Sequence, residues 1–240
     1  MEPGFSISII GAGRFGAFWG KELSKFADVI FYDREGNQGE PGRASLEECF
    51  KRKFIFLAIP ISEVENFATD NGLKIPQDSI LVDLSSVKMH PEKCFKKYLP
   101  EGNGFILAHP LFGPDSASGG VKGHRMAVTL FKCPGEAENE FRALLTDCLG
   151  VEIVLLSSKE HDRLMALNLT LMHHLGRAFN RMGIEEVPLK MRSLTEIAKI
   201  TRFVMNDREQ MFRDFYKYNP YSEEVKEEFT EAFFSISPKG

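Results

Sequence analysis

The sequence has no excess of positive charge. Its 240 residues include 30 lysines and arginines against 34 aspartates and glutamates, which gives a formal net charge of −4 at pH 7. General nucleic-acid binding usually requires a basic patch or stripe, so this balance argues against it. Any anionic ligand of the protein must therefore be recognised by a few local residues.

Cysteines are few and scattered, and long apolar runs are lacking. The cysteines form no close pair of the kind that metal sites and redox motifs use, so we expect reduced thiols. No apolar run approaches the roughly 18 residues that a membrane span needs. These features predict a cytoplasmic protein without a metal site and without a membrane segment. The four cysteines are Cys49, Cys94, Cys133 and Cys148.

The first two thirds of the chain alternate between strand and helix patterns. Short apolar runs joined by helical crossovers predict a mostly parallel sheet that is covered on both faces. The predicted strands are at residues 5–10, 28–33, 54–60, 79–85, 105–108, 125–131 and 151–156. The first predicted helix follows residue 16 and runs to about residue 26, and the others are at residues 44–52, 61–71, 90–99 and 135–148.

From residue 157 onward the sequence predicts helices only. Ser157 and Glu160 have the spacing of a capping box, in which each side chain satisfies a free amide at the helix start. The helix that follows, to about residue 182, is apolar on nearly every side and needs burial on more than one face. The remaining residues are too few to enclose it, so we expect a second subunit to help. The fold class is therefore α/β, with a doubly wound domain over 1–156 and an all-helical dimerisation domain over 157–240.

Residues 11–16, GAGRFG, lie between the first predicted strand and the first predicted helix. Gly11 allows a tight turn, Gly13 leaves room for a pyrophosphate, and Gly16 lets the helix pack closely. The free amides and the dipole at the helix start also favour phosphate. A glycine turn can be purely structural, but the flanking strand and helix favour dinucleotide binding, as does an acidic residue about twenty positions later.

That acidic residue, Asp33, ends the second predicted strand and can accept hydrogen bonds from both ribose hydroxyls. Its carboxylate would repel a 2′-phosphate, which favours NAD over NADP. Arg34 keeps NADP open, because a guanidinium group can pair with a 2′-phosphate. Small and apolar residues at 57–60 would let the cofactor lie against the backbone, although a simple strand end explains them equally well. The expected cofactor-binding residues are Gly11, Gly13, Arg14, Phe15, Gly16, Asp33, Arg34, Ala58 and Pro60.

Polar groups follow the fourth and fifth predicted strands. Residues 83–88 read DLSSVK and residues 108–115 read AHPLFGPD, in which His109 directly follows an apolar run and prolines stiffen the chain after it. The carboxyl ends of parallel strands share one edge of a sheet, so we expect Ser86 and His109 at the same crevice. Taken alone, a histidine at a strand end is more often structural, and serines here are equally consistent with helix capping.

Together these motifs resemble the prephenate and arogenate dehydrogenases of tyrosine biosynthesis. The resemblance covers nearly the whole chain, and residues 218–220 look like the plant-type branch. It implies an N-terminal Rossmann domain, a helical domain that forms a homodimer, and NAD(P)-dependent oxidative decarboxylation of prephenate to 4-hydroxyphenylpyruvate. The matching segments are residues 11–16, 57–60, 83–88, 108–115, 160–162 and 173–177.

By this resemblance His109 hydrogen-bonds the ring hydroxyl of a cyclohexadienol and takes its proton as hydride leaves the same carbon for the nicotinamide. Loss of the ring carboxylate as carbon dioxide then gives the aromatic product. An imidazole suits this task, because its ordinary pKa of about 6.5 leaves it largely unprotonated at cell pH. Ser86 would support the hydroxyl and His109. His173 would line the substrate cavity, although a packed or interface histidine is an equal alternative, and the neighbouring His174 is expected to be structural.

The dianionic substrate also requires a fixed cation. Arg202 falls where many bacterial members of the family carry the arginine that binds a substrate carboxylate, and a guanidinium fork suits that role. Arg192 and Lys88 are rivals for it. The Glu-His-Asp run at residues 160–162 recurs in the family, and at a helix start we interpret it as capping and dipole chemistry.

One departure bears on the substrate. Some relatives carry an acidic residue shortly after the histidine motif, where it can meet the ammonium group of arogenate. Gly119 stands at the nearest equivalent position here, which favours prephenate, although Asp115 could reverse this preference. Arogenate dehydrogenase, which yields tyrosine directly, is therefore the alternative.

Two other functions compete. A β-hydroxyacid dehydrogenase would need a catalytic lysine on the helix after the sheet, and the predicted helix from 157 to 182 offers only Lys159, at its start. A non-catalytic dinucleotide-binding redox sensor would explain the glycine turn but would leave Ser86, His109 and Arg202 without a role.

Overall fold

The computed structural model describes residues 5–34, 36 and 42–236, which form two compact units, Met1–His161 and Asp162–Gly240. The predicted boundary lay five residues earlier, after residue 156. The first turn of helix α6 (Ser158–Met165) belongs to the first unit because it is bonded to the sheet. Ser158 Oγ lies 3.1 Å from Thr129 Oγ1, and His161 Nε2 lies 2.9 Å from His109 Nδ1.

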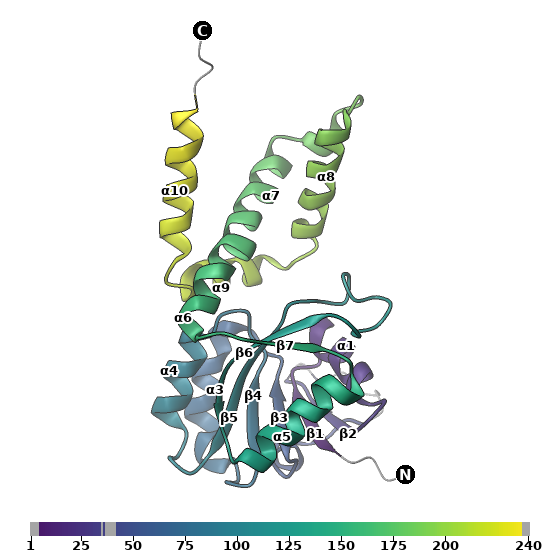
Figure 1. The fold of residues 1–240 in the computed structure, drawn as a ribbon, viewed down its shortest axis with the longest axis vertical. Helices are drawn as coiled ribbons and strands as arrows, with labels where there is room; N and C mark the ends of the chain where they lie inside the picture. Colours follow the sequence, from purple (N-terminus) through teal and green to yellow (C-terminus); the bar gives the residue numbers. More distant parts are fainter. Residues whose placement is uncertain (1–4, 35, 37–41, 237–240) are drawn as a thin grey trace. The chain divides into compact units, whose positions relative to one another are not determined.

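The first unit is built on a seven-stranded sheet in the order β2-β1-β3-β4-β5-β6-β7 (Figure 1). Strands β1 to β5 are parallel, β6 is antiparallel to β5, and β7 is parallel to β6. The predicted mostly parallel, doubly wound Rossmann-type sheet is thus confirmed. The strands are β1 (Ser6–Ile10), β2 (Asp28–Tyr32), β3 (Phe54–Leu57), β4 (Ile80–Asp83), β5 (Gly104–Pro110), β6 (Arg125–Lys132) and β7 (Glu152–Leu155).

Helices cover both faces of this sheet because the strands are apolar on both sides. Along β3, Phe54 and Phe56 enter the core beneath α1 and α5, whereas Ile55 and Leu57 enter the core beneath α2, α3 and α4. Alternate residues of a strand point to opposite faces, so a continuous apolar run fills two cores. These helices are α1 (Arg14–Leu23), α2 (Leu46–Phe50), α3 (Val64–Asn71), α4 (Met89–Tyr98) and α5 (Gly135–Ala143), which continues as a π-helical turn (Leu144–Cys148).

Strand β5 is longer than predicted. The sequence indicated an end at residue 108, but the strand continues to Pro110, with a register shift between Leu107 and Ala108. Beyond Leu107, which pairs with the last residue of β4, β5 pairs with β6, and His109 lies opposite Ala127. A proline is tolerated where one side of the strand needs no donor. His109 therefore lies inside a strand and is held by backbone pairing.

The second unit contains helices only in its described part, as predicted. They are α7 (Met172–Arg181), α8 (Arg192–Met205), α9 (Glu209–Tyr218) and α10 (Ser222–Ser235). The single helix predicted from 157 to 182 consists of α6, a π-helical segment (Ala166–Leu171) and α7. Helix α7 approaches α8 closely at Gly176, where an added Cβ would lie 2.9 Å from Val204 Cβ.

The predicted capping box is confirmed at the start of α6. The amide of Ser157 donates to Glu160 Oε2 at 2.9 Å, and the amide of Glu160 donates to Ser157 Oγ at 3.1 Å.

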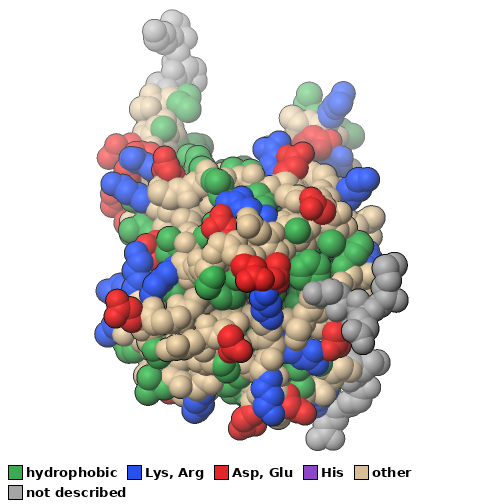
Figure 2. All heavy atoms as spheres, turned by 60° about the horizontal axis from the view of Figure 1, so that its bottom comes forward, with side chains coloured by type: hydrophobic (Ala, Val, Ile, Leu, Met, Phe, Trp, Pro, Cys, Tyr) green, Lys and Arg blue, Asp and Glu red, His purple; other side chains and the backbone are tan. Residues whose placement is uncertain are grey.

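Figure 2 shows acidic and basic side chains interspersed over the face that it presents. No helix of the described ranges is long and apolar enough to cross a membrane. All four cysteines are free thiols.

Candidate active site

The glycine turn between β1 and α1 is shaped for a phosphate ligand. Gly11 has a φ of +104°, and an added Cβ there would lie 2.4 Å from the carbonyl oxygen of Ala58. A Cβ at Gly16 would lie 1.9 Å from the carbonyl oxygen of Gly11, so both positions need glycine. A Cβ at Gly13 would meet nothing within 4 Å. The open space in front of Gly13 is where a pyrophosphate can approach the backbone.

The start of α1 favours an anion. Its N-cap residue, Gly13, contributes no side-chain hydrogen bond, and the first turn contains no acidic residue. The first amides of the helix therefore point toward the same open space, and the helix dipole adds a positive potential. The turn fits the diphosphate of a dinucleotide.

Four further predicted cofactor residues follow the ends of β2 and β3. Asp33 follows β2, and its Oδ2 accepts a hydrogen bond from the Ala12 amide at 2.6 Å, which holds the carboxylate beside the turn. Arg34 is 80% exposed in its side chain and lies 3.4 Å from the carboxylate of Glu63. Ala58 forms the wall against Gly11, and Pro60 precedes a short 3-10 helix (Ile61–Glu63).

Two predicted residues inside the turn contact protein groups. Arg14 pairs with Asp115, which lies in the loop after β5. The ring of Phe15 packs against Trp19, with ring centroids 6.3 Å apart. Phe15 thus contributes to the aromatic core under α1.

His109 is a buried histidine with a histidine partner. It lies two residues after Leu107, which pairs with the last residue of β4, and its Nδ1 lies 2.9 Å from Nε2 of His161, with the two rings at 78°. Burial lowers the pKa of His109 well below its ordinary value of 6.5, and the nearby charges of His161 and Lys88 lower it further. The imidazole is therefore neutral at cell pH and able to accept a proton.

A buried ion pair supports the same strand. Lys88, the N-cap residue of α4, pairs with Asp83 at the end of β4, and its Nζ donates to the carbonyl oxygen of Ala108 at 2.6 Å. The Lys88 side chain is 0% exposed. The sequence makes Lys88 a rival ligand of a substrate carboxylate, whereas in the structure its ammonium group contacts Asp83 and the carbonyl oxygen of Ala108, next to His109.

The two serines before Lys88 differ. The hydroxyl of Ser85 lies 2.9 Å from Asp83 Oδ2 and 2.8 Å from the carbonyl oxygen of Val87, so it stabilises the turn. Ser86 is half-buried in the same turn. Since Asp83 pairs with Leu107, this turn and His109 lie at the same edge of the sheet, as predicted.

The predicted substrate residues of the second unit are placed on α7 and α8. His173 is buried, its Nε2 lies 3.3 Å from Asp207 Oδ2, and its ring stacks on Phe212. Its Nδ1 has no hydrogen-bond partner in the described part of the chain. Arg202 is 65% exposed in its side chain, with Nε 3.4 Å from Glu185 Oε2, and Arg192 begins α8 at an exposed position. The roles of these residues toward a substrate stay predictions.

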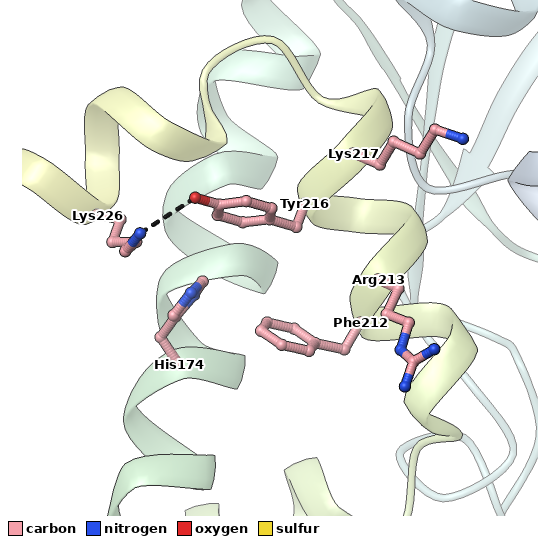
Figure 3. A pocket seen from close by; sticks show the side chains of 6 residues that line it. All are labelled: His174, Phe212, Arg213, Tyr216, Lys217 and Lys226. Carbon is pink, nitrogen blue, oxygen red and sulfur yellow. Dashed lines mark hydrogen bonds between the residues drawn. The ribbon is translucent and has the colours of Figure 1, made fainter.

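Figure 3 shows a pocket within the second unit that contains none of the predicted site residues. His174 lines it from α7, and its Nδ1 donates to the carbonyl oxygen of Thr170 at 2.8 Å, in agreement with the structural role predicted for this histidine. The pocket, of about 470 Å³, is lined by His174, Phe212, Arg213, Tyr216, Lys217 and Lys226.

Comparisons with known proteins match one group of dehydrogenases. The family model described as "Prephenate dehydrogenase, nucleotide-binding domain" matches residues 35–132. Arogenate dehydrogenase 1, chloroplastic, of Arabidopsis thaliana is 25% identical over 96% of this chain. The chain is thus similar to proteins named prephenate or arogenate dehydrogenases. Another relative, the probable prephenate dehydrogenase [NADP(+)] of Schizosaccharomyces pombe, is 26% identical over 77% of this chain. The chain spans 38% of the length of the Arabidopsis relative and 44% of the Schizosaccharomyces relative.

Solved structures of the prephenate/arogenate dehydrogenase family share the fold. Prephenate dehydrogenase from Aquifex aeolicus has a TM-score of 0.74 at 16% identity, over 96% of this chain and 90% of that one. Synechocystis arogenate dehydrogenase has a TM-score of 0.69 at 18% identity, over 95% of this chain and 90% of that one.

One residue of the candidate site was not predicted from the sequence. His161 was interpreted only as part of a capping pattern, yet it is fully buried and contacts His109. The available signal was its position one turn into a helix whose start was correctly predicted, because that helix directly follows the last strand of the sheet.

Proposed function

We propose that this protein is an NAD(P)-dependent dehydrogenase that converts prephenate to 4-hydroxyphenylpyruvate and carbon dioxide, with His109 as the general base. One observation carries the proposal: a neutral, buried imidazole lies at the carboxyl edge of the sheet that also carries the glycine turn. Ligands of open parallel sheets bind in the crevice at this edge.

In this proposal each step uses groups of the chain. Nε2 of His109 takes the proton of the ring hydroxyl, while Ser86 orients that hydroxyl. A nicotinamide dinucleotide bound at the glycine turn supplies the acceptor for the hydride that leaves the same carbon. The bond from the ring to its carboxylate then breaks, carbon dioxide leaves, and the electron pair enters the ring. Aromatisation drives the reaction, and general-base catalysis of this kind contributes about 10² to 10⁴ in rate.

For the cofactor, the position of Asp33 favours NAD. Its carboxylate lies beside the glycine turn, where it would oppose a 2′-phosphate. NADP is the alternative, since Arg34 is largely exposed and the name of the Schizosaccharomyces relative includes NADP(+). A solved structure of prephenate dehydrogenase from Aquifex aeolicus is a complex with hydroxyphenyl propionate and NAD+.

For the substrate, the surroundings of the histidine motif favour prephenate. Asp115, which could otherwise receive the ammonium group of arogenate, pairs with Arg14. Gly119 lies in an exposed turn and offers no carboxylate. Arogenate is the second candidate, because two Arabidopsis relatives are named arogenate dehydrogenases. We assign the substrate carboxylate to Arg202, with Arg192 as the rival and His173 as a further residue of the substrate cavity.

We further propose that the protein forms a homodimer through its C-terminal helices. Large apolar side chains are exposed on α6, on the segment after it, on α8 and on α10, and surfaces of this kind mark association sites. The exposed residues include Leu164, Leu167, Ile200, Phe203, Phe229, Phe233 and Phe234.

A two-by-two assay tests the proposal, with prephenate or arogenate as substrate and NAD or NADP as cofactor. The absorbance of the reduced nicotinamide reports turnover. We expect turnover with prephenate and NAD, and turnover in another combination would reassign substrate or cofactor. If folded protein binds the cofactor but all four combinations stay inactive, the dehydrogenase proposal is wrong, and the redox-sensor function replaces it.

A further inference from the structure

We propose that His161 is a positioning residue of the active site, which accepts the Nδ1 proton of His109 and so keeps Nε2 of His109 unprotonated. The inference rests on the proposed function for its catalytic meaning, but the hydrogen bond can be tested without turnover.

The contact between the two rings permits two arrangements. Nδ1 of His109 and Nε2 of His161 lie 2.9 Å apart, so one hydrogen is shared between two nitrogens. A neutral imidazole carries its hydrogen on one nitrogen and a lone pair on the other. If His109 donates, its Nε2 has the lone pair. If His161 donates, Nε2 of His109 carries a hydrogen and cannot take a proton from a substrate.

The first arrangement also remains valid after the reaction. Once Nε2 of His109 has taken a proton, both of its nitrogens carry hydrogens, and Nδ1 still donates to His161. In the second arrangement, protonation of His109 would require His161 to give up its hydrogen or to lose the contact. An acceptor at His161 therefore serves the neutral base and its protonated form with the same geometry.

The charges around His109 explain why a histidine, and not a carboxylate, is a suitable partner. Among the described residues, His161 from α6 contacts it, and Lys88 at the start of α4 acts on its charge, with Asp83 balancing the Lys88 charge. The charge of Lys88 lowers the pKa of His109, whereas a carboxylate partner would raise it. The contact with His161 thus orients His109 and leaves it unprotonated.

His161 is held firmly enough for this role. It is 0% exposed, and it follows the capping box of Ser157 and Glu160, which fixes the start of α6. Its backbone amide donates to the carbonyl oxygen of Ser157 at 2.9 Å.

The experiment is ¹⁵N NMR of the full chain labelled at its six histidines, with His109→Asn to assign the signals. In the wild type we expect His109 to be protonated at Nδ1 and unprotonated at Nε2. His161→Gln, which can still accept, should keep this tautomer. His161→Leu, which cannot, should yield a mixture of tautomers. A wild-type His109 protonated at Nε2, or an unchanged spectrum in His161→Leu, would overturn the proposal.

Kinetics add a second measurement. We expect His161→Leu to lower kcat about tenfold, the effect of one lost neutral hydrogen bond, with KM little changed. His161→Gln should restore most of kcat. If His161→Leu does not fold, the tautomer of His109 in the NMR spectra of the wild type and of His161→Gln tests the proposal. An inactive protein with the expected tautomer would refute the proposed function alone, whereas an active protein with the other tautomer would refute only the role of His161.

Discussion

Lys88 donates a hydrogen bond from Nζ to the carbonyl oxygen of Ala108 at 2.6 Å, directly before His109 in the chain. The same ammonium group pairs with Asp83, and the two side chains are 0% and 1% exposed. A buried ion pair gives little net stability, but the loss of one partner leaves a buried charge without compensation. The pair therefore ties the ends of β4 and β5 together beneath the proposed base.

Removal of the Lys88 charge should destabilise the protein and change the titration of His109. Lys88→Met is expected to lower the free energy of unfolding by about 3 to 5 kcal/mol, because Asp83 stays buried without its partner. The pKa of His109 should rise, since Lys88 lowers it. Urea denaturation measures the change in the free energy of unfolding. The pH dependence of the His109 NMR signals measures the change in its pKa.

Lys96→Met is the matched control on the same helix. Its partner Glu92 is a helix neighbour, and Lys96 is 56% exposed, so the expected cost is below about 1 kcal/mol. Equal effects of the two substitutions would contradict the account of the buried pair.

Two glycine substitutions should separate folding from cofactor binding. Gly16→Ala is expected to lower the melting temperature, because its Cβ would clash with the carbonyl oxygen of Gly11. Gly13→Ala should leave the melting temperature nearly unchanged and weaken NAD binding, because its Cβ enters the open space in front of α1. Calorimetric titration and thermal unfolding measure the two effects. Unchanged affinity in Gly13→Ala would move the diphosphate away from this turn.

The stability of the protein should fall on the acid side of neutrality. The pKa of His109 is well below 6.5 in the folded protein, mainly through burial, whereas the unfolded chain has the ordinary value. Below pH 6.5 the unfolded state therefore binds a proton that the folded state does not bind. The free energy of unfolding then falls as pH falls, by at most about 1.4 kcal/mol per pH unit for one histidine.

Substitution of His109 tests this linkage. The free energy of unfolding of His109→Asn is measured by urea denaturation between about pH 5 and 7. Its slope against pH should be smaller than in the wild type, by an amount that corresponds to the uptake of up to one proton on unfolding. Identical slopes in the wild type and the variant would show that His109 titrates normally in the folded protein.

Cofactor preference should depend on Asp33. Asp33→Ser removes the carboxylate that opposes a 2′-phosphate and should reduce the preference for NAD over NADP, measured as the ratio of dissociation constants. Arg34→Ser is the matched substitution, because it removes the group that would favour NADP. If Asp33→Ser leaves the ratio unchanged, a different part of the site determines the preference.

Much of the fold could be predicted from local patterns. The strands of the sheet are short apolar runs, and β3 fills two cores with alternate residues, so sequence alone indicates a covered parallel sheet. The start of α6 was predictable because Ser157 and Glu160 interact within one turn. Such features depend on residues that are close in the chain.

The missed features depend on residues that are far apart in the chain. Strand β5 continues through His109 because β6, which follows a long connection, pairs with it in the antiparallel direction. The contact of His161 with His109 joins residues 52 positions apart, and Lys88 reaches across 20 positions to Ala108. A motif indicates which groups carry the chemistry, but only tertiary packing decides which groups support them.

The most direct test of the central claim is the turnover of His109→Asn. With the substrate and cofactor that the wild type uses, we expect kcat to fall by about a hundredfold or more, as for loss of a general base, while the dissociation constant of the cofactor stays unchanged. His90→Asn, on α4, is the control and should retain normal turnover. Near-normal turnover in His109→Asn would contradict the account and remove His109 from the mechanism.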